Sequence, residues 1–287
     1  MLGAIIGDTV GSVYEFHNIK TTEFPLFDPR CNYTDDSIMT MAVANLLLTD
    51  PQHGMDTLEA SFLNFAKKYP CPMGGYGGGF NHWLFHPEAL GDYSSQDYKP
   101  GSRHPYNSFG NGAAMRCSAN GWMFDTLEET ERVAGLSAAI THNHPEGIKG
   151  AQSTAAAIFM ARNGKSKEEI RDYISTKYNY NLNRTCDEIR AVYDWDSSCQ
   201  GTVPEAMVAF LDSTDFESAI RLAVSLGGDS DTRACITGGI AEAFYKTIPE
   251  SIALKIWGLI PEDFKAIFRA METRTSYRLP SILKEQK

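Results

Sequence analysis

The chain lacks closely spaced cysteines and long apolar runs. Its six cysteines are scattered without a CxxC pair, which argues against a zinc ribbon and against a disulfide framework in a chain of 287 residues. No run approaches the roughly 18 apolar residues needed to cross a membrane. The N-terminal sequence also has no basic region preceding an apolar core, so we expect a soluble, untargeted protein of the cytoplasm with no membrane partner.

Positive charge is also scarce. The chain has 26 Lys plus Arg against 36 Asp plus Glu, a formal net charge of −10. A broad electrostatic contact with the backbone of DNA or RNA is therefore not expected. Any anionic ligand must be held locally, by metal ions, backbone N–H groups or a few side chains.

Sustained alternation of apolar and polar residues is rare, and regular spacing is helical. Met39, Val43 and Leu47 share one helical face, and Pro51 ends that pattern. Further helical segments are predicted near 56–68, 128–140, 147–163, 167–178, 185–193, 204–211, 215–226, 233–247, 249–258 and 262–274. Residues 70–118 are expected to be irregular, and a connection of this length is usually functional. We predict an all-α fold in a single domain over residues 1–287, with two domains sharing a cleft as the alternative.

Glycines recur every four residues at the N-terminus, in GAIIGDTVGSVYE. Gly3, Gly7 and Gly11 would share a helical face, although glycine is a poor helix former by about 1 kcal/mol. We therefore expect another backbone to approach this face closely. Asp8 and Glu15 are seven residues apart, which on a continuous helix would bring both carboxylates to one side. Two solvated acids beside a packing stripe are the structural alternative.

Two Thr/Asp clusters stand at predicted helix starts. In Thr34-Asp35-Asp36, helix capping alone would explain the residues. In the second cluster, residues 227–232 (GGDSDT), two glycines precede Asp229, Asp231 and Thr232, which exceeds what a cap requires. Both clusters offer only oxygen ligands, the chemistry of Mg²⁺ or Mn²⁺, and two clusters suggest two ions.

Two glycine-rich stretches could hold phosphate. Residues 74–80 (GGYGGGF) and 108–116 (SFGNGAAMR) combine bare backbone with aromatic residues, and consecutive N–H groups there could converge on phosphate oxygens. Neither is a GxGxxG after a strand, so a Rossmann site is not indicated. A flexible surface loop is the alternative.

His142 and His144 lack a third ligand for zinc at suitable spacing. Capping of a helix C-terminus and hydrogen bonding are the favoured roles of these histidines, and His142 is also a candidate for ligand contact.

The motifs GAIIGDTVGSVYE, YTDDS, GYGGGF, SFGNGAAMR, Thr141-His142 and GGDSDT resemble, in this order, those of the ADP-ribosylglycohydrolase family. They span residues 3 to 232. The resemblance implies a compact orthogonal all-α bundle with a two-metal cleft holding two Mg²⁺ or Mn²⁺ ions. It implies metal ligation, direct or through water, by Thr34, Asp35, Asp36, Asp229, Asp231 and Thr232. It implies substrate contacts from Gly77, Gly79, Ser108, Phe109, Gly110, Asn111, Gly112 and His142.

The family resemblance also implies a reaction. Glu15, Asp36 and Asp231 would be the catalytic acids, and a water oriented by carboxylates would attack C1″ of the terminal ribose to release ADP-ribose. The partner would be an ADP-ribosylated protein or a small molecule containing ADP-ribose, and we expect a monomer. Two alternatives are a two-metal pyrophosphohydrolase, which would yield AMP and ribose phosphate, and an inactive ADP-ribose-binding relative. The sequence does not distinguish arginine, serine and O-acetyl linkages.

Overall fold

The computed structural model of the protein describes residues 1–87 and 103–284. Within these ranges the regular structure is helical, with two isolated β-bridges and no strand, which confirms the predicted all-α class. The helices are α1 (Leu2–Gly11), α2 (Asp35–Thr49), α3 (Met55–Lys68), α4 (Gly78–Phe85), α5 (Gly112–Met115), α6 (Asn120–Met123), α7 (Leu127–Ala139), α8 (Pro145–Arg162), α9 (Lys167–Tyr178), α10 (Cys186–Val192), α11 (Cys199–Asp212), α12 (Phe216–Ser225), α13 (Ser230–Tyr245), α14 (Glu250–Leu259), α15 (Glu262–Arg274) and α16 (Ser281–Lys284).

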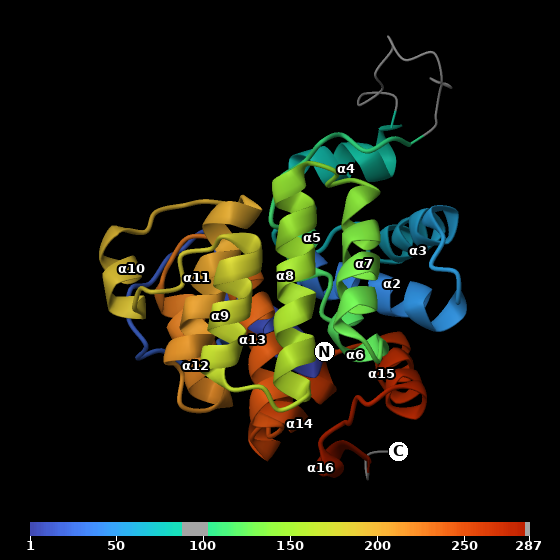
Figure 1. Ribbon diagram of the computed structural model, residues 1–287. Coiled ribbons are helices and arrows are strands. Elements are labelled where there is room, and N and C mark those ends of the chain that lie inside the picture. Colours follow the sequence, from blue (N-terminus) through green and yellow to red (C-terminus); the bar gives the residue numbers. More distant parts are fainter. Residues whose placement is uncertain (88–102, 285–287) are drawn as a thin grey trace.

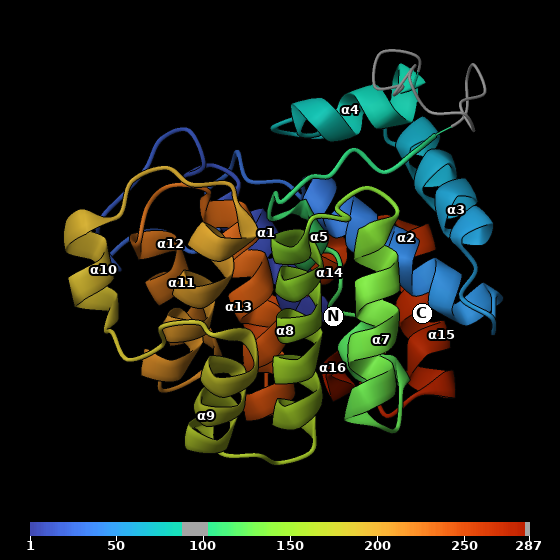
Figure 2. The same ribbon diagram turned by 45° about the horizontal axis from the view of Figure 1, so that its top comes forward.

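Helix α13 lies in the interior of the bundle and is buried along nearly its whole length. Figure 1 shows α9 to α12 gathered on one side of it and α2, α3 and α15 on the other, while α4 lies across the ends of α7 and α8. The view in Figure 2 shows the same crossing of α4 over the α7 and α8 pair. Helix α4 therefore crosses the α7 and α8 pair, as expected for a bundle whose helices are not all parallel.

The glycine stripe of α1 packs directly on α13. A methyl group at Gly7 would lie 1.9 Å from the carbonyl oxygen of Ala234, and one at Gly3 would lie 2.3 Å from that of Gly238. Gly11 in the same way faces the backbone of Asp231. Only glycine permits this backbone contact, because any Cβ would overlap the facing main chain. The close approach brings Asp8 of α1 toward the first turn of α13.

The starts of α2 and α13 follow from their sequences. Thr34 is the N-cap of α2, and its Oγ1 accepts a hydrogen bond from the Asp36 N–H at 3.2 Å. Helix α13 begins after Gly227 and Gly228, whose φ values of 75° and 69° suit glycine. Its N-cap, Asp229, makes no side-chain capping bond, so the Asp229 carboxylate is left for other contacts.

Several sequence-based boundaries need correction. Helix α11 begins at Cys199 rather than near 204, because Pro204 is accommodated inside the helix. The stretch predicted as irregular, 70–118, contains α4 and α5, and its part at 88–102 lies outside the described residues. Helix α1 ends at Gly11, so the two-turn relation expected between Asp8 and Glu15 does not apply.

One further finding concerns membranes. Among the described helices, none has both the length and the apolarity that crossing a bilayer requires.

Candidate active site

Carboxylates from three parts of the chain converge where α1, α2 and α13 meet. Ligand atoms of Asp8, Asp36 and Asp231 lie within 4.8 Å of one another, and so do those of Glu15, Asp229 and Asp231. Asp231 belongs to both triads and therefore links them. The two Thr/Asp clusters of the sequence are therefore neighbours in space, with Asp8 and Glu15 added from the N-terminal segment.

Asp8 connects α1 to the start of α2. Its Oδ2 accepts hydrogen bonds from the main-chain N–H groups of Thr34 at 2.9 Å and Ser37 at 3.1 Å, and from the Ser37 hydroxyl. Its Oδ1 accepts a bond of 2.7 Å from the Thr34 hydroxyl. Thr34 thus both caps α2 and orients Asp8. These four bonds fix one wall of the acidic cluster.

Burial and mutual repulsion disfavour the ionised form of these carboxyl groups. Burial raises the pKa of Asp8 to about 6, although its hydrogen bonds oppose the shift. Burial, reinforced by Asp229 and Asp8, raises the pKa of Glu15 to about 8. Burial and neighbouring carboxylates likewise raise the pKa values of Asp35, Asp36 and Asp231 well above the usual range. Opposing positive charge would be needed to keep the whole group ionised at neutral pH.

The cluster fits divalent cations by its composition and its unpaired atoms. The buried oxygens Oδ1 of Asp36 and Oδ1 of Asp231 have no hydrogen-bond partner. No ion pair joins any of the six acids to Lys, Arg or His in the ranges that the structure describes. Oxygen-only donors with free buried lone pairs suit Mg²⁺ or Mn²⁺ rather than zinc. Both threonines contact Asp36 Oδ2: the Thr232 hydroxyl donates to it at 3.3 Å, and the Thr34 hydroxyl lies 3.4 Å from it.

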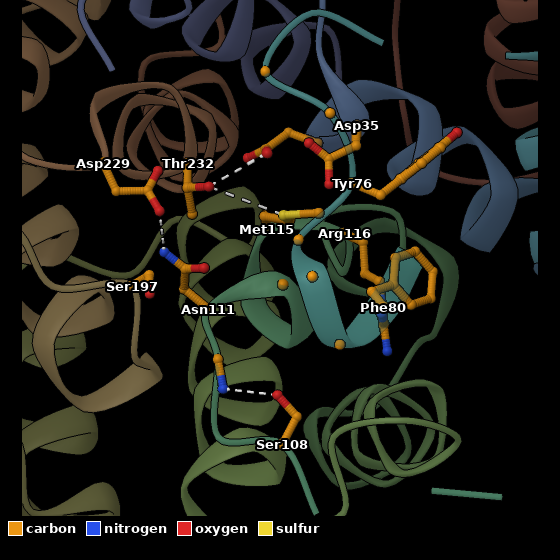
Figure 3. Close-up of a pocket in the computed structure, with 18 of the residues that line it drawn as sticks. Asp35, Tyr76, Phe80, Ser108, Asn111, Met115, Arg116, Ser197, Asp229 and Thr232 are labelled. Carbon is orange, nitrogen blue, oxygen red and sulfur yellow. Dashed lines mark hydrogen bonds between the residues drawn. The ribbon is translucent and has the colours of Figure 1, made fainter. Parts of the chain in front are cut away.

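A cavity of about 480 Å³ opens from this cluster. Figure 3 shows Asp35, Asp229 and Thr232 at one end of it, with Asn111 and Ser108 extending away from them. The cavity is lined at this end by Glu15, Asp35, Asp36, Asp229 and Thr232. Two predicted ligands, Thr34 and Asp231, are buried behind that lining. The predicted metal ligands therefore occupy one region but differ in access to the cavity.

The first glycine-rich stretch forms another wall. Gly74 and Gly75 have φ values of 77° and 81° and turn the chain before α4. Gly77 is the N-cap of α4, and a methyl group there would meet no atom within 4 Å. Gly79 faces the Tyr106 ring, which a methyl group would approach to 2.9 Å. An open helix start with bare backbone is suited to an anionic ligand.

The second stretch, residues 108–112, runs along the cavity and is tied at both ends. The Asn111 N–H donates to the Ser197 carbonyl at 2.8 Å, and its side-chain Nδ2 donates to Asp229 Oδ2 at 2.8 Å. Ser108 Oγ accepts from the Gly110 N–H at 3.1 Å. Ser108, Gly110, Asn111 and Gly112 line the cavity. The side chain of Asn111 therefore connects the loop to the acidic cluster.

Phe109 and His142 differ in placement. Phe109 does not line the cavity; its ring is 49% exposed and packs edge-on against His144. His142 is buried and lines the cavity, beside Gly110 and Gly112. His144 Nδ1 accepts from the Glu146 N–H at the start of α8, so this histidine caps the N-terminus of a helix rather than its C-terminus.

Several residues of the site were not predicted. Asp8 was not predicted as a site residue, yet it completes the triad with Asp36 and Asp231. The available signal was its position in the glycine stripe, between Gly7 and Gly11. Phe16 and Trp195, both exposed, stack with ring centroids 5.6 Å apart at the cavity. Tyr106 and Arg116 also line it. These contacts join residues far apart in the chain, and no local pattern indicates them.

Comparison with known proteins identifies the family. The family model described as ADP-ribosylglycohydrolase matches residues 1–275, so the chain belongs to this family, as its motifs predicted. ADP-ribosylhydrolase ARH3 from Mus musculus is 27% identical, covering 88% of this chain and 84% of its own length. The Homo sapiens protein of that name is 26% identical, covering 88% of this chain and 86% of its own length.

A more distant relative and a solved structure agree with this family assignment. The putative ADP-ribosyl glycohydrolase L543 of Acanthamoeba polyphaga mimivirus is 25% identical, covering 87% of each chain. A solved structure described as an ADP-ribosylglycohydrolase-related protein complex has a TM-score of 0.69 at 21% identity, covering 95% of this chain and 96% of that one; this likeness shows the fold. The family and the curated relatives support an ADP-ribosyl hydrolase activity.

Proposed function

We propose that this protein uses two divalent cations, Mg²⁺ or Mn²⁺, to hydrolyse the bond at C1″ of ADP-ribose attached to a protein side chain or to a small acyl group. The observation that carries the proposal is the pair of carboxylate triads sharing Asp231 at one end of a glycine-lined cavity. Such a pair of sites can take two ions side by side, and the cavity can take an elongated anionic ligand.

The cations would be held by Asp8, Asp35, Asp36, Asp229 and Asp231, with Thr34 and Thr232 orienting the carboxylates. Divalent ions in such a site supply Lewis-acid activation of water and positioning of ribose hydroxyls. Asp8 joins the ligand set because its ligand atom and those of Asp36 and Asp231 lie within 4.8 Å of one another, as do those of the second triad. Thr34 is assigned an indirect role because its hydroxyl already donates to Asp8.

The remaining residues would bind and orient the substrate. The Gly110 and Asn111 N–H groups already donate to acceptors within the protein, so the other polar groups of residues 108–112 that face the cavity, with the backbone N–H groups of the α4 start near Gly77, would hold the diphosphate. The terminal ribose would then lie at the acidic end, where Glu15, Asp36 and Asp231 would orient the water that attacks C1″ and take up the proton that it loses. Holding the sugar and the carboxylates in fixed geometry lowers the barrier through orientation and electrostatic stabilisation. Phe109 lies outside the cavity lining, and its contact with the ligand stays a prediction.

The test is product analysis on defined substrates. The protein with Mg²⁺ is incubated separately with arginine-linked, serine-linked and O-acetyl ADP-ribose, and released ADP-ribose is measured by chromatography. Asp231→Ala should lower turnover by at least 100-fold, because it removes the carboxylate common to both triads. Asp172→Ala, an exposed acid on α9, is the matched control and should remain active.

The outcomes separate the alternatives. Release of AMP and ribose phosphate would instead identify a pyrophosphohydrolase. No product from any substrate, with cations shown to be bound, would leave a binding protein. Turnover by Asp231→Ala within a few-fold of the parent at saturating Mg²⁺ would contradict the assignment of the metal centre.

A further inference from the structure

Three side chains in the wall of the cavity form a continuous hydrogen-bonded chain. The guanidinium of Arg116 is fully buried, and its Nη2 donates to Thr141 Oγ1 at 2.9 Å and to the Ser137 carbonyl at 3.0 Å. Thr141 Oγ1 lies 2.7 Å from His142 Nδ1. Thr141 is itself fully buried, so water does not compete for its hydroxyl.

The chemistry of these groups gives the chain a direction. A guanidinium has donors only, so Thr141 Oγ1 must accept from Arg116. The single hydroxyl proton of Thr141 then needs an acceptor, and within the described ranges the one that lies within hydrogen-bond distance is His142 Nδ1. A bare Nδ1 therefore satisfies every group in the chain. A proton on Nδ1 would leave the buried Thr141 hydroxyl without an acceptor, which is unfavourable.

The other nitrogen of the ring faces the glycine-rich loop. A methyl group at Gly112 would lie 3.2 Å from His142 Nε2, and one at Gly110 would lie 3.5 Å from it. His142 lines the cavity, and Nε2 has no hydrogen-bond partner among residues 1–87 and 103–284. Burial and the nearby Arg116 charge hold the pKa of His142 well below its usual value. A neutral ring with a bare Nδ1 carries its proton on Nε2.

Arg116 acts through Thr141. Its guanidinium packs over the rings of Phe62 and Phe80, 4.7 Å and 5.7 Å from their centroids, and Figure 3 shows it beside Phe80. Its Nε is buried and has no partner, so the groups that fix its place are the two rings and the acceptors of Nη2. This arrangement holds Nη2 against Thr141.

We propose that Arg116 and Thr141 are positioning residues that fix His142 as the neutral Nε2–H tautomer, so that its ring presents one hydrogen-bond donor to an anionic oxygen bound in the cavity beside Gly110 and Gly112. The identity of that anion as the diphosphate of ADP-ribose rests on the proposed function. The orientation of the proton does not, because it follows from the protein's own hydrogen bonds.

The tautomer can be measured directly. Two-bond ¹H–¹⁵N correlation spectra of the ¹⁵N-labelled full-length protein at pH 7 distinguish the protonated ring nitrogen from the bare one, and loss of the signal in His142→Gln assigns it. We expect Nε2 protonated and Nδ1 bare in the parent protein and in Thr141→Ser, which keeps the hydroxyl. Thr141→Val, of similar shape, should populate the Nδ1–H form.

A matched control is available in α8. Thr154 is as buried as Thr141 but its hydroxyl has no partner, so Thr154→Val should leave the His142 spectrum unchanged. If the parent shows a proton on Nδ1, or if Thr141→Val keeps the parent tautomer, the positioning role is wrong.

Binding gives a second readout. By calorimetry with Mg²⁺ present, Thr141→Val should weaken ADP-ribose binding about tenfold, the effect of replacing a donor by an acceptor facing an anion. Thr141→Ser and Thr154→Val should stay within about twofold of the parent. Hydrolysis by Thr141→Val should show a raised KM with a smaller change in kcat. A tautomer change without weaker binding would contradict the contact with the anion. A parent protein that does not bind ADP-ribose would contradict the proposed function, and the spectra would still test the positioning role.

Discussion

Asn111 and Asp229, 118 residues apart, are joined by a hydrogen bond of 2.8 Å from the amide Nδ2 to Oδ2. Figure 3 shows this bond linking the loop to the acidic end of the cavity. The same amide donates to Thr202 Oγ1 at 3.1 Å. The Asn111 side chain therefore sets the distance between two proposed binding regions: the loop that would hold the diphosphate and the Asp229 carboxylate that would hold a cation.

This bond predicts different costs for two substitutions of Asn111. Asn111→Ala removes one hydrogen bond to a charged group, worth about 1.5–3 kcal/mol, and should lower kcat/KM about tenfold or more. Asn111→Asp places a second carboxylate against Asp229 and should lower it further, by about 100-fold, because the like charges repel. Hydrolysis assays at saturating Mg²⁺ measure both. Asn163→Ala, at an exposed amide after α8, is the control, and equal activity of Asn111→Asp and parent would contradict the role.

Removing divalent cations should weaken binding of ADP-ribose. Those acids at the cavity that remain ionised would then repel the diphosphate, and burial leaves that repulsion poorly screened. We expect at least a tenfold loss of affinity by calorimetry in excess chelator, with recovery on adding Mg²⁺. Asp231→Asn, with one charge fewer, should be less sensitive to the chelator. An affinity unchanged by the chelator would argue against a metal centre in the cavity.

The raised pKa values predict how pH affects stability without cations. Burial raises the pKa of Asp8 to about 6 and of Glu15 to about 8, whereas unfolded carboxyls titrate near about 4. Between these values the folded protein binds more protons than the unfolded chain, so these groups make stability fall as pH rises from about 4 to about 8. Above that range their penalty is constant.

Cations should therefore stabilise the protein most at alkaline pH. Protons compete with Mg²⁺ for the same oxygens, so the rise in melting temperature on adding Mg²⁺ should be larger at pH 8 than at pH 5. At 100 times the dissociation constant a cation contributes about 2.7 kcal/mol, or about 5 °C for a chain of this size. Differential scanning calorimetry measures both values; equal shifts at the two pH values would show that these carboxyls do not bind the ion.

The fold class and the acidic motifs could be predicted because their signals are local. The periodicity of 167–178 and 262–274 matches α9 and α15 residue for residue. The paired Thr/Asp clusters lie at helix starts, where the sequence placed them. Helix α11 was predicted too short because Pro204 normally begins a helix, and here tertiary packing accommodates it within one.

What the sequence could not show is contact between distant segments. Phe16 meets Trp195, and Arg116 reaches His142 through Thr141, only because the bundle folds those segments together. The sequence predicted Asp8 and Glu15 on one side of a continuous helix, but α1 ends at Gly11, so the two residues lie on different segments. Each then joins a different carboxylate triad.

The contact of α1 with α13 predicts that stability and cation binding fall together. Gly7→Ala places a methyl group 1.9 Å from the Ala234 carbonyl oxygen, so the helices must separate, at a cost of about 3 kcal/mol. Because α1 carries Asp8 and α13 carries Asp231, the same shift should weaken Mg²⁺ binding. Gly258→Ala in α14, where a methyl group meets no atom within 4 Å, should instead stabilise by about 0.5–1 kcal/mol and leave Mg²⁺ affinity unchanged. Urea unfolding and calorimetric titration test the pair, and a Gly7→Ala protein as stable as the parent would mean that the glycine stripe does not set the spacing of the acidic cluster.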